Sequence, residues 1–206
     1  MEKLIHLLAG FCLGVVLLPQ ADYSQANPAA NTANINNDAA AEEKARKFFT
    51  DLEVIDQNGN KLRFYSDVLK GRVVLISFIF TNCEYACPML AQRLKQARSL
   101  MADSITDDVW FVSVSVDPER DTPEAMKKFA KRQGVDESRW IFLTGDKQNL
   151  DTIVRKLGQY TPDVEAHTTL MLAGNTITRH WTRVMPMVPP DGIAQQMRSL
   201  VEETPG

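Results

Sequence analysis

Two cysteines separated by three residues, Cys83 and Cys87, are the side chains of this sequence best suited to chemistry. They follow the apolar run 73–80, and Pro88 comes directly after the second cysteine. Because proline lacks an amide hydrogen, it is tolerated in a helix only in the first turn, so Pro88 predicts that Cys87 lies at a helix start and Cys83 on the preceding loop. A helix N-terminus favours anionic groups, and both sulfurs are therefore expected where a thiolate is stabilised.

The spacing of the two cysteines favours a functional pair over a structural disulfide. A bond between Cys83 and Cys87 would close too short a loop to stabilise the fold much. Three intervening residues suit two thiolates around a soft ion, and soft thiolates select Cu(I), with zinc as the competitor. Two sulfurs alone leave copper under-coordinated, so a third ligand is expected from elsewhere in the fold. His167 and His180 are the candidates.

The first 26 residues have the pattern of a targeting segment. Lys3 precedes the apolar run 4–18, and small residues at 24–26 fit a cleavage site. The run is shorter than the ~20 residues that cross a bilayer, so residues 1–26 are predicted to be a cleaved signal peptide, with a membrane anchor as the alternative. Both predict a periplasmic or otherwise extracytoplasmic protein, and an anchor would add association with the membrane.

The elements that must position the cysteines alternate between strand and helix patterns. This βαβ order up to residue 157, followed by a hairpin and a helix, is the thioredoxin-like plan: an α/β fold whose central mixed sheet is flanked by helices. An Asn-Gly turn in 57–60 predicts an additional N-terminal β-hairpin. The expected strands are 52–56, 61–64, 73–80, 110–116, 140–143, 169–173 and 176–184, and the expected helices are about 88–101, 123–133, 148–157 and 192–202.

Length and composition fit one ordinary domain. The 206 residues, 44% of them hydrophobic, suffice for one sizeable core, and the net charge of −3 argues against nucleic acid as a partner. Residues 51–206 are predicted to form this domain. The segment 27–50 is expected to be a flexible tether, rich in Asn and Ala up to Ala41, with a short helix over 39–49.

Two motifs resemble those of the Sco/SenC family, thioredoxin-fold copper chaperones that take part in assembling the binuclear copper centre of cytochrome c oxidase. Residues 81–88, TNCEYACP, are similar to the family's cysteine motif, and residues 115–123, SVDPERDTP, are similar to its second signature. The likeness extends from about Asp51 to the C-terminus. It implies that His167 is the third metal ligand. His180, in the expected hairpin, is interpreted as a surface residue.

The resemblance implies a copper metallochaperone. Its cargo would be Cu(I), with Cu(II) as a candidate in the working cycle. Its partners would be a copper-accepting protein, such as a cytochrome c oxidase subunit, and a thiol-disulfide reductant. The alternative is a thiol-disulfide reductase acting on partner cysteines outside the cytoplasm, with Cys83 as nucleophile and no need for a histidine. A copper sensor would share every ligand with the chaperone.

Two carboxylates follow the strand that neighbours the cysteine strand. Asp117 is a candidate for tuning the thiols or assisting Cu(II) binding. Asp121 is a weaker candidate for tuning, because Asp121 or Thr122 would also make a good helix cap, and capping is the favoured interpretation of Asp121. Met185 and Met187 carry thioethers that can bind Cu(I), but packing in the core or a loop is favoured for them.

The sequence departs from the family pattern at two positions. Glu84 stands where the family often has proline, and Ala166 precedes His167 where the family often has aspartate. A carboxylate between two thiols opposes their ionisation, and the missing aspartate predicts a less firmly oriented imidazole. The identity of the partner therefore stays open at this point.

Overall fold

The computed structural model describes residues 28–101, 105 and 108–204, and the side chains from residue 38 onward. The predicted signal peptide or anchor, 1–26, lies outside these residues. The chain divides into two units between Asp38 and Ala39, and the second unit holds the sheet. None of the helices in the described part of the chain combines the length and the apolar character that crossing a membrane requires.

Helix α1 runs from Pro28 to Phe49, and its residues from Ala39 onward belong to the second unit. The helix expected over 39–49 is therefore present as the last part of a longer one. The segment 28–41, expected to be a flexible tether, is helical instead. Its alanines are strong helix formers, and Pro28 stands at the first helical position, where proline is preferred.

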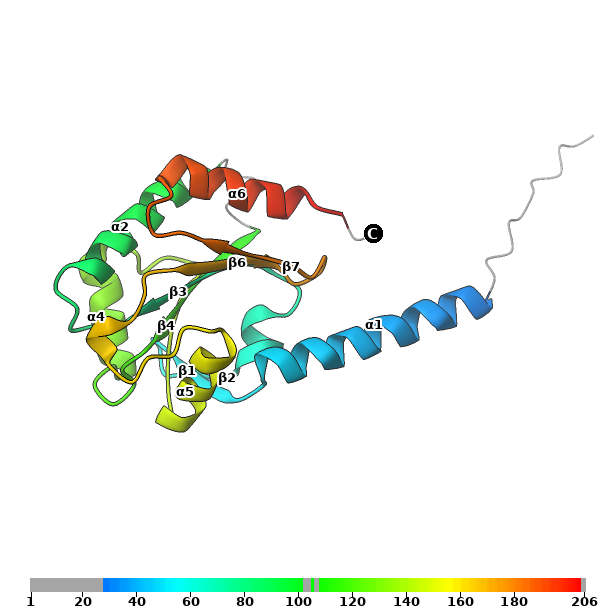
Figure 1. Ribbon diagram of the computed structural model, residues 1–206, viewed down its shortest axis with the longest axis horizontal. Coiled ribbons are helices and arrows are strands. Elements are labelled where there is room, and N and C mark those ends of the chain that lie inside the picture. The colour runs from blue at the N-terminus through cyan, green and yellow to red at the C-terminus, as the bar shows by residue number, and fades with distance from the viewer. Residues whose placement is uncertain (1–27, 102–104, 106–107, 205–206) are drawn as a thin grey trace, which may run out of the picture. The chain divides into compact units, whose positions relative to one another are not determined.

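A seven-stranded mixed sheet forms the centre of the second unit (Figure 1). The strand order is β2-β1-β5-β4-β3-β6-β7, with β3, β4 and β5 parallel to one another and the remaining pairs antiparallel. The predicted mixed sheet is thus confirmed, and β1 and β2 pair at one of its edges. The strands are β1 (Glu53–Asp56), β2 (Lys61–Arg63), β3 (Val73–Ile79), β4 (Val109–Ser115), β5 (Trp140–Thr144), β6 (Met171–Asn175) and β7 (His180–Val184).

The helices that cover the sheet lie within a few residues of their predicted positions, and the helix predicted at 123–133 has those bounds. Two short helical turns were not predicted: a π-helical turn η1 and a 3-10 turn η2. The helices are η1 (Phe64–Leu69), α2 (Ala86–Ser99), α4 (Pro123–Gln133), α5 (Lys147–Lys156), η2 (Val164–Ala166) and α6 (Pro190–Glu202).

Strand β3 is buried along its whole length because both faces of the sheet are covered. Leu75 packs into a core with α2, α4 and α6, whereas its neighbour Ile76 packs into a second core with α5, η1 and the end of α1. Since β3 and β4 are parallel and Ile79 pairs with Ser115, the loops that follow these two strands meet at the same edge of the sheet. Both candidate motifs lie in these loops.

Candidate metal centre

The two cysteines lie where the sequence predicts them. Cys83 is on the loop after β3 and is half-buried, and Cys87 directly follows Ala86, the first residue of α2, and is fully buried. The backbone N–H of Cys87 donates a hydrogen bond to Sγ of Cys83 at 3.2 Å. Both cysteines are free thiols.

The thiol of Cys87 differs from the expectation of a stabilised thiolate. Burial raises the pKa of the Cys87 thiol, and Cys83 and the carboxylate of Asp121 raise this pKa further. The prediction from the helix N-terminus is therefore wrong for Cys87, because the loss of hydration outweighs the favourable position at the helix start. A cation bound to this sulfur would supply the positive charge that the proton otherwise provides.

His167 follows η2 and faces the buried cysteine. Its Nδ1 lies 2.9 Å from the backbone oxygen of Val164. A carbonyl oxygen can only accept, so Nδ1 carries the hydrogen and Nε2 keeps a lone pair available to a metal. Nε2 lies 4.0 Å from Sγ of Cys87. The loose imidazole expected from Ala166 is thus not found, because a main-chain carbonyl orients the ring and Phe80 packs against it at 5.3 Å between ring centres.

The separation between His167 and Cys87 can be compared with metal geometry. Bonds of roughly 2.0–2.3 Å at trigonal or tetrahedral angles place a sulfur and a nitrogen ligand about 3.6–3.8 Å apart. The observed 4.0 Å is close to this. Across residues 38–204 as described, however, no three His, Cys, Asp or Glu side chains already stand together as a complete metal site. The sulfur of Cys83 lies 3.2 Å from the backbone nitrogen of Cys87, so the three predicted ligands belong to the same part of the fold.

Asp121 fastens the cysteine loop to the neighbouring loop. Its buried carboxylate accepts hydrogen bonds from the N–H of Thr81 at 2.9 Å, from the hydroxyl of Thr81 at 2.6 Å and from the hydroxyl of Ser115 at 2.6 Å. Burial raises the pKa of the Asp121 carboxyl despite these donors. The favoured interpretation of Asp121 as a helix cap is wrong, because Thr122 caps α4 by accepting the N–H of Ala125.

Asp117 is also buried, and its contacts lie within its own loop. Its carboxylate pairs with the guanidinium of Arg120, and its backbone N–H donates to the hydroxyl of Ser115 at 3.0 Å. A role for Asp117 in tuning the site therefore stays a prediction. The same holds for Asp121, whose charge is the smallest of the causes that raise the pKa of Cys87.

The second histidine lies away from the cysteines. His180 is exposed at the start of β7, and its Nδ1 lies 2.5 Å from Oε1 of Glu203. It pairs across the sheet with Asn175, opposite Val73 at the start of β3, whereas the cysteines follow the end of that strand. The interpretation of His180 as a surface residue is confirmed.

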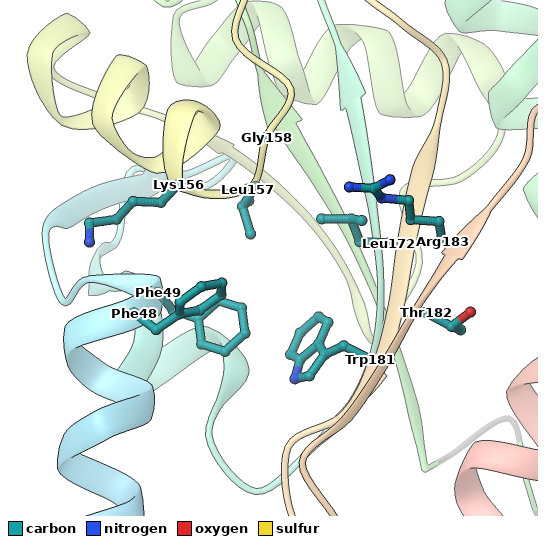
Figure 2. Close-up of a pocket in the computed structure, with 9 residues that line it drawn as sticks. All are labelled: Phe48, Phe49, Lys156, Leu157, Gly158, Leu172, Trp181, Thr182 and Arg183. Carbon is teal, nitrogen blue, oxygen red and sulfur yellow. The ribbon is translucent and has the colours of Figure 1, made fainter.

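An apolar hollow of about 340 Å³ on the other face of the sheet has no counterpart in the sequence predictions (Figure 2). Phe49 and Trp181 face each other in it, with 4.7 Å between ring centres. Gly174 permits this arrangement, since a Cβ there would lie 2.3 Å from the indole. Leu172, which also lines the hollow, belongs to the core under α5, whereas Cys87 belongs to the core under α2. The hollow is therefore not part of the cysteine site.

The mixed sheet and the cysteine pair after its central strand define a protein of the thioredoxin-like class. The family model SCO1/SenC matches residues 40–202, and the chain belongs to this family. The resemblance of the two sequence motifs is thereby confirmed.

Relatives and solved structures agree with this assignment. The SCO1 protein homolog of Bacillus subtilis is 44% identical over 95 residues, a match that covers 46% of this chain and 47%, about half, of that protein. The SCO2-like protein of Rickettsia conorii is 33% identical over 152 residues, covering 74% of this chain and 67% of its own length.

Among solved structures, Bradyrhizobium japonicum ScoI with copper bound has a TM-score of 0.61 and 26% identity, covering 72% of this chain and 96% of ScoI. BsSco, described as a member of the Sco family of cytochrome c oxidase assembly proteins, has a TM-score of 0.61 and 28% identity, covering 74% of this chain and 92% of BsSco. The predicted thioredoxin-like fold is thus confirmed.

Proposed function

We propose that this protein is a copper metallochaperone that holds one copper ion with Cys83, Cys87 and His167 and passes it to a copper-accepting protein. The observation that carries this proposal is the lone pair of Nε2 of His167, held 4.0 Å from the buried sulfur of Cys87 by the hydrogen bond from Nδ1 to Val164. Two sulfurs and an imidazole suit Cu(I), and the similar ScoI was solved with copper bound. Copper is cargo here, not a resident cofactor.

The three residues would have different roles in binding and in releasing copper. Cys87 and His167 form the inner part of the site, and binding displaces the proton that Cys87 otherwise retains. Cys83 is the more exposed sulfur and lies on a loop, so it is the ligand that an acceptor would replace first. Oxidation of both thiols to a disulfide removes two electrons and two protons and withdraws both sulfur ligands. Copper release and the redox state of the pair would therefore be coupled.

Family membership supports a proposal for the partner and for the location. BsSco is described as belonging to a family of cytochrome c oxidase assembly proteins, which supports a subunit of that enzyme as the copper acceptor. A thiol-disulfide reductant would return the cysteines to the copper-binding state. A Bacillus anthracis family member, 28% identical, is described as a lipoprotein. This supports an extracytoplasmic site of action, with 1–26 as signal peptide or anchor, 27–50 as the connecting segment and 51–206 as the working domain.

Anaerobic copper titration against a competing Cu(I) chelator tests the proposal. The reduced wild type should take up one equivalent, and Cys83→Ser or Cys87→Ser should abolish tight binding. His167→Ala should weaken binding by at least the roughly 10–100-fold that loss of an outer partner of a metal ligand costs. His180→Ala is the matched control and should bind as the wild type does. Absence of stoichiometric uptake by wild type, or equal affinities of the two histidine variants, contradicts the proposal.

A thiol-disulfide reductase is the second candidate, because both cysteines are free thiols and Cys83 is partly accessible. The reduced pair would give two electrons and two protons to a partner disulfide and become a disulfide itself. This reaction needs no histidine. Full turnover of a mixed-disulfide substrate by His167→Ala, together with no copper uptake by wild type, would select this function.

A further inference from the structure

The methionines of this protein fall into two groups. Seven of its eight methionines lie among the described residues. Four of these are almost fully buried in one core: Met101, Met126, Met171 and Met197. The remaining three are exposed, by 65% at Met89, 56% at Met185 and 84% at Met187. Methionine is usually buried, so three exposed thioethers call for a physical reason.

The exposed methionines gather beside the cysteine site. Met89 lies two residues after Cys87 in α2, and Met185 and Met187 lie in the turn between β7 and α6. Val184 pairs with Met171 at the start of β6, the strand that follows His167. The end of β7 therefore lies at the same edge of the sheet as the loop of Cys83 and Cys87. The backbone N–H of Val188 donates to the oxygen of Met185 at 3.1 Å and fixes the turn.

Met89 and Met187 line one hollow of about 200 Å³. Residues two apart on a helix point to different sides, so Met89 faces outward while Cys87 faces the core. The hollow is therefore separate from the sulfur of Cys87 and lies beside it. Its other lining residues come from α2 and from the chain after His167 and after β7: Ala86, Leu90, Arg93, Thr169 and Pro186.

Two thioethers and one guanidinium are the chemically distinctive groups that line this hollow. Thioethers are neutral ligands that select Cu(I) over hard cations. The guanidinium of Arg93 lines the same space and opposes a bare cation, which limits the affinity. A volume of about 200 Å³ is below the range of about 300–1,000 Å³ typical of pockets for organic ligands.

We propose that Met89 and Met187 form a second, weaker Cu(I) site that holds the ion beside the Cys83, Cys87 and His167 centre. This inference rests on the proposed function, because copper must reach the protein for the second site to matter. The thioether site carries no proton to displace and no charge to neutralise. It would therefore bind Cu(I) whether the cysteines are reduced or oxidised, which the thiol site cannot do.

A Cys83→Ser/Cys87→Ser variant isolates the thioether site from the thiol site. With this variant labelled with ¹³C at the methionine methyl groups, Ag(I), a redox-inert ion of the same charge, and anaerobic Cu(I) are titrated in NMR experiments. The methyl signals of Met89 and Met187 should shift with either ion, whereas those of the buried Met126 and Met197 should not. Adding Met89→Leu and Met187→Leu should weaken Ag(I) binding at least tenfold. Met101→Leu, just past the C-terminal end of α2, is the matched control and should leave Ag(I) binding unchanged.

The result that overturns the inference is distinct from failure of the proposed function. If the two methyl signals do not move with excess Ag(I) or Cu(I), or if the two leucine substitutions leave the affinity as it was, there is no thioether site. Shifts with an apolar peptide but not with metal would identify a docking surface instead and equally overturn it. Copper uptake by the wild-type cysteines is measured separately, and its outcome does not depend on the thioether site. Arg93 is half-buried, and Arg93→Gln should strengthen Ag(I) binding by about twofold or more, because it removes a nearby positive charge.

Discussion

The loops after β3 and β4 meet at the same edge of the sheet but are built in opposite ways. In the loop after β4, Asp117 and Asp121 are buried and hydrogen-bonded to Arg120, Ser115 and the neighbouring loop. The loop after β3 is held at Thr81 by two hydrogen bonds, and then Glu84, Tyr85 and Ala86 are exposed. The loop after β4 is a fixed frame, whereas the cysteine loop is held at Thr81 and at Cys83, whose N–H donates to the oxygen of Phe80 at 3.2 Å, and is exposed beyond them.

This difference matches what a transfer site needs. A cargo ion must be held in a defined place, which requires a rigid support, yet a ligand must also be able to leave it. Buried Cys87 and oriented His167 belong to the well-packed part, and half-buried Cys83 lies at the start of the exposed part. The comparison predicts that substitutions in the frame cost stability, whereas substitutions in the exposed part of the cysteine loop do not.

The largest effect is expected at Asp121. Asp121→Ala leaves three buried or partly buried donors on Thr81 and Ser115 without an acceptor. Because each unsatisfied donor costs on the order of 1 kcal/mol, the free energy of unfolding should fall by about 2–4 kcal/mol in urea denaturation. Asp121→Asn keeps one carbonyl oxygen and avoids a charge that burial disfavours, so it should lose clearly less. Equal losses for the two variants would show that the hydrogen bonds do not hold the frame.

The next effect concerns the pH dependence of stability through Cys87. Burial raises the pKa of this thiol above its ordinary value of 9.0. The unfolded chain therefore releases the thiol proton at a pH at which the folded protein retains it, and the stabilisation is lost as the pH rises above about 9. The slope should reach up to about 1.4 kcal/mol per pH unit in the reduced, metal-free protein. Urea denaturation at pH 8, 9 and 10 measures it, and Cys87→Ser should lack this slope. If the free energy of unfolding falls with pH equally in the wild type and in Cys87→Ser, the pH dependence does not come from the buried thiol.

The smallest effect is expected at Glu84, in the exposed part of the cysteine loop. Glu84 is exposed, so Glu84→Gln should change the free energy of unfolding by less than about 0.5 kcal/mol. If copper affinity also changes little, the carboxylate between the thiols is a surface group. A loss of stability comparable to that of Asp121→Ala would remove the distinction between frame and loop.

Sequence reasoning located most of the fold because the patterns were strong. The continuous apolar run of β3 and the position of Pro88 placed Cys83 and Cys87 correctly. The helix that reaches back to Pro28 was missed, because an Asn-rich stretch without an apolar stripe gives no packing signal. The hollow beside Trp181 was also missed, since it depends on the close approach of an indole to Gly174, which only the pairing of β6 and β7 creates.

Within the site, the residue types could be identified from the sequence, but the degree of burial and the hydrogen-bond partners of these residues could not. The helix start at Cys87 was visible, whereas the depth of its burial was not, and burial decides the direction of its pKa shift. Asp121 and Thr122 were equally plausible caps by residue type, and only the fold assigns one to the helix and the other to Thr81. Packing was the favoured interpretation of Met185 and Met187, yet both side chains are exposed.

The oxygen that orients His167 belongs to the main chain of Val164. A side-chain substitution at residue 164 leaves the backbone carbonyl in place. Alanine scanning of this segment will therefore not reveal the hydrogen bond that orients His167. The orientation of His167 therefore does not depend on the side chain of residue 166, which is an alanine here, but on the 3-10 turn Val164–Ala166. The orientation of the imidazole is thus set by the backbone conformation of residues 164–167, and no single residue type in the sequence indicates it.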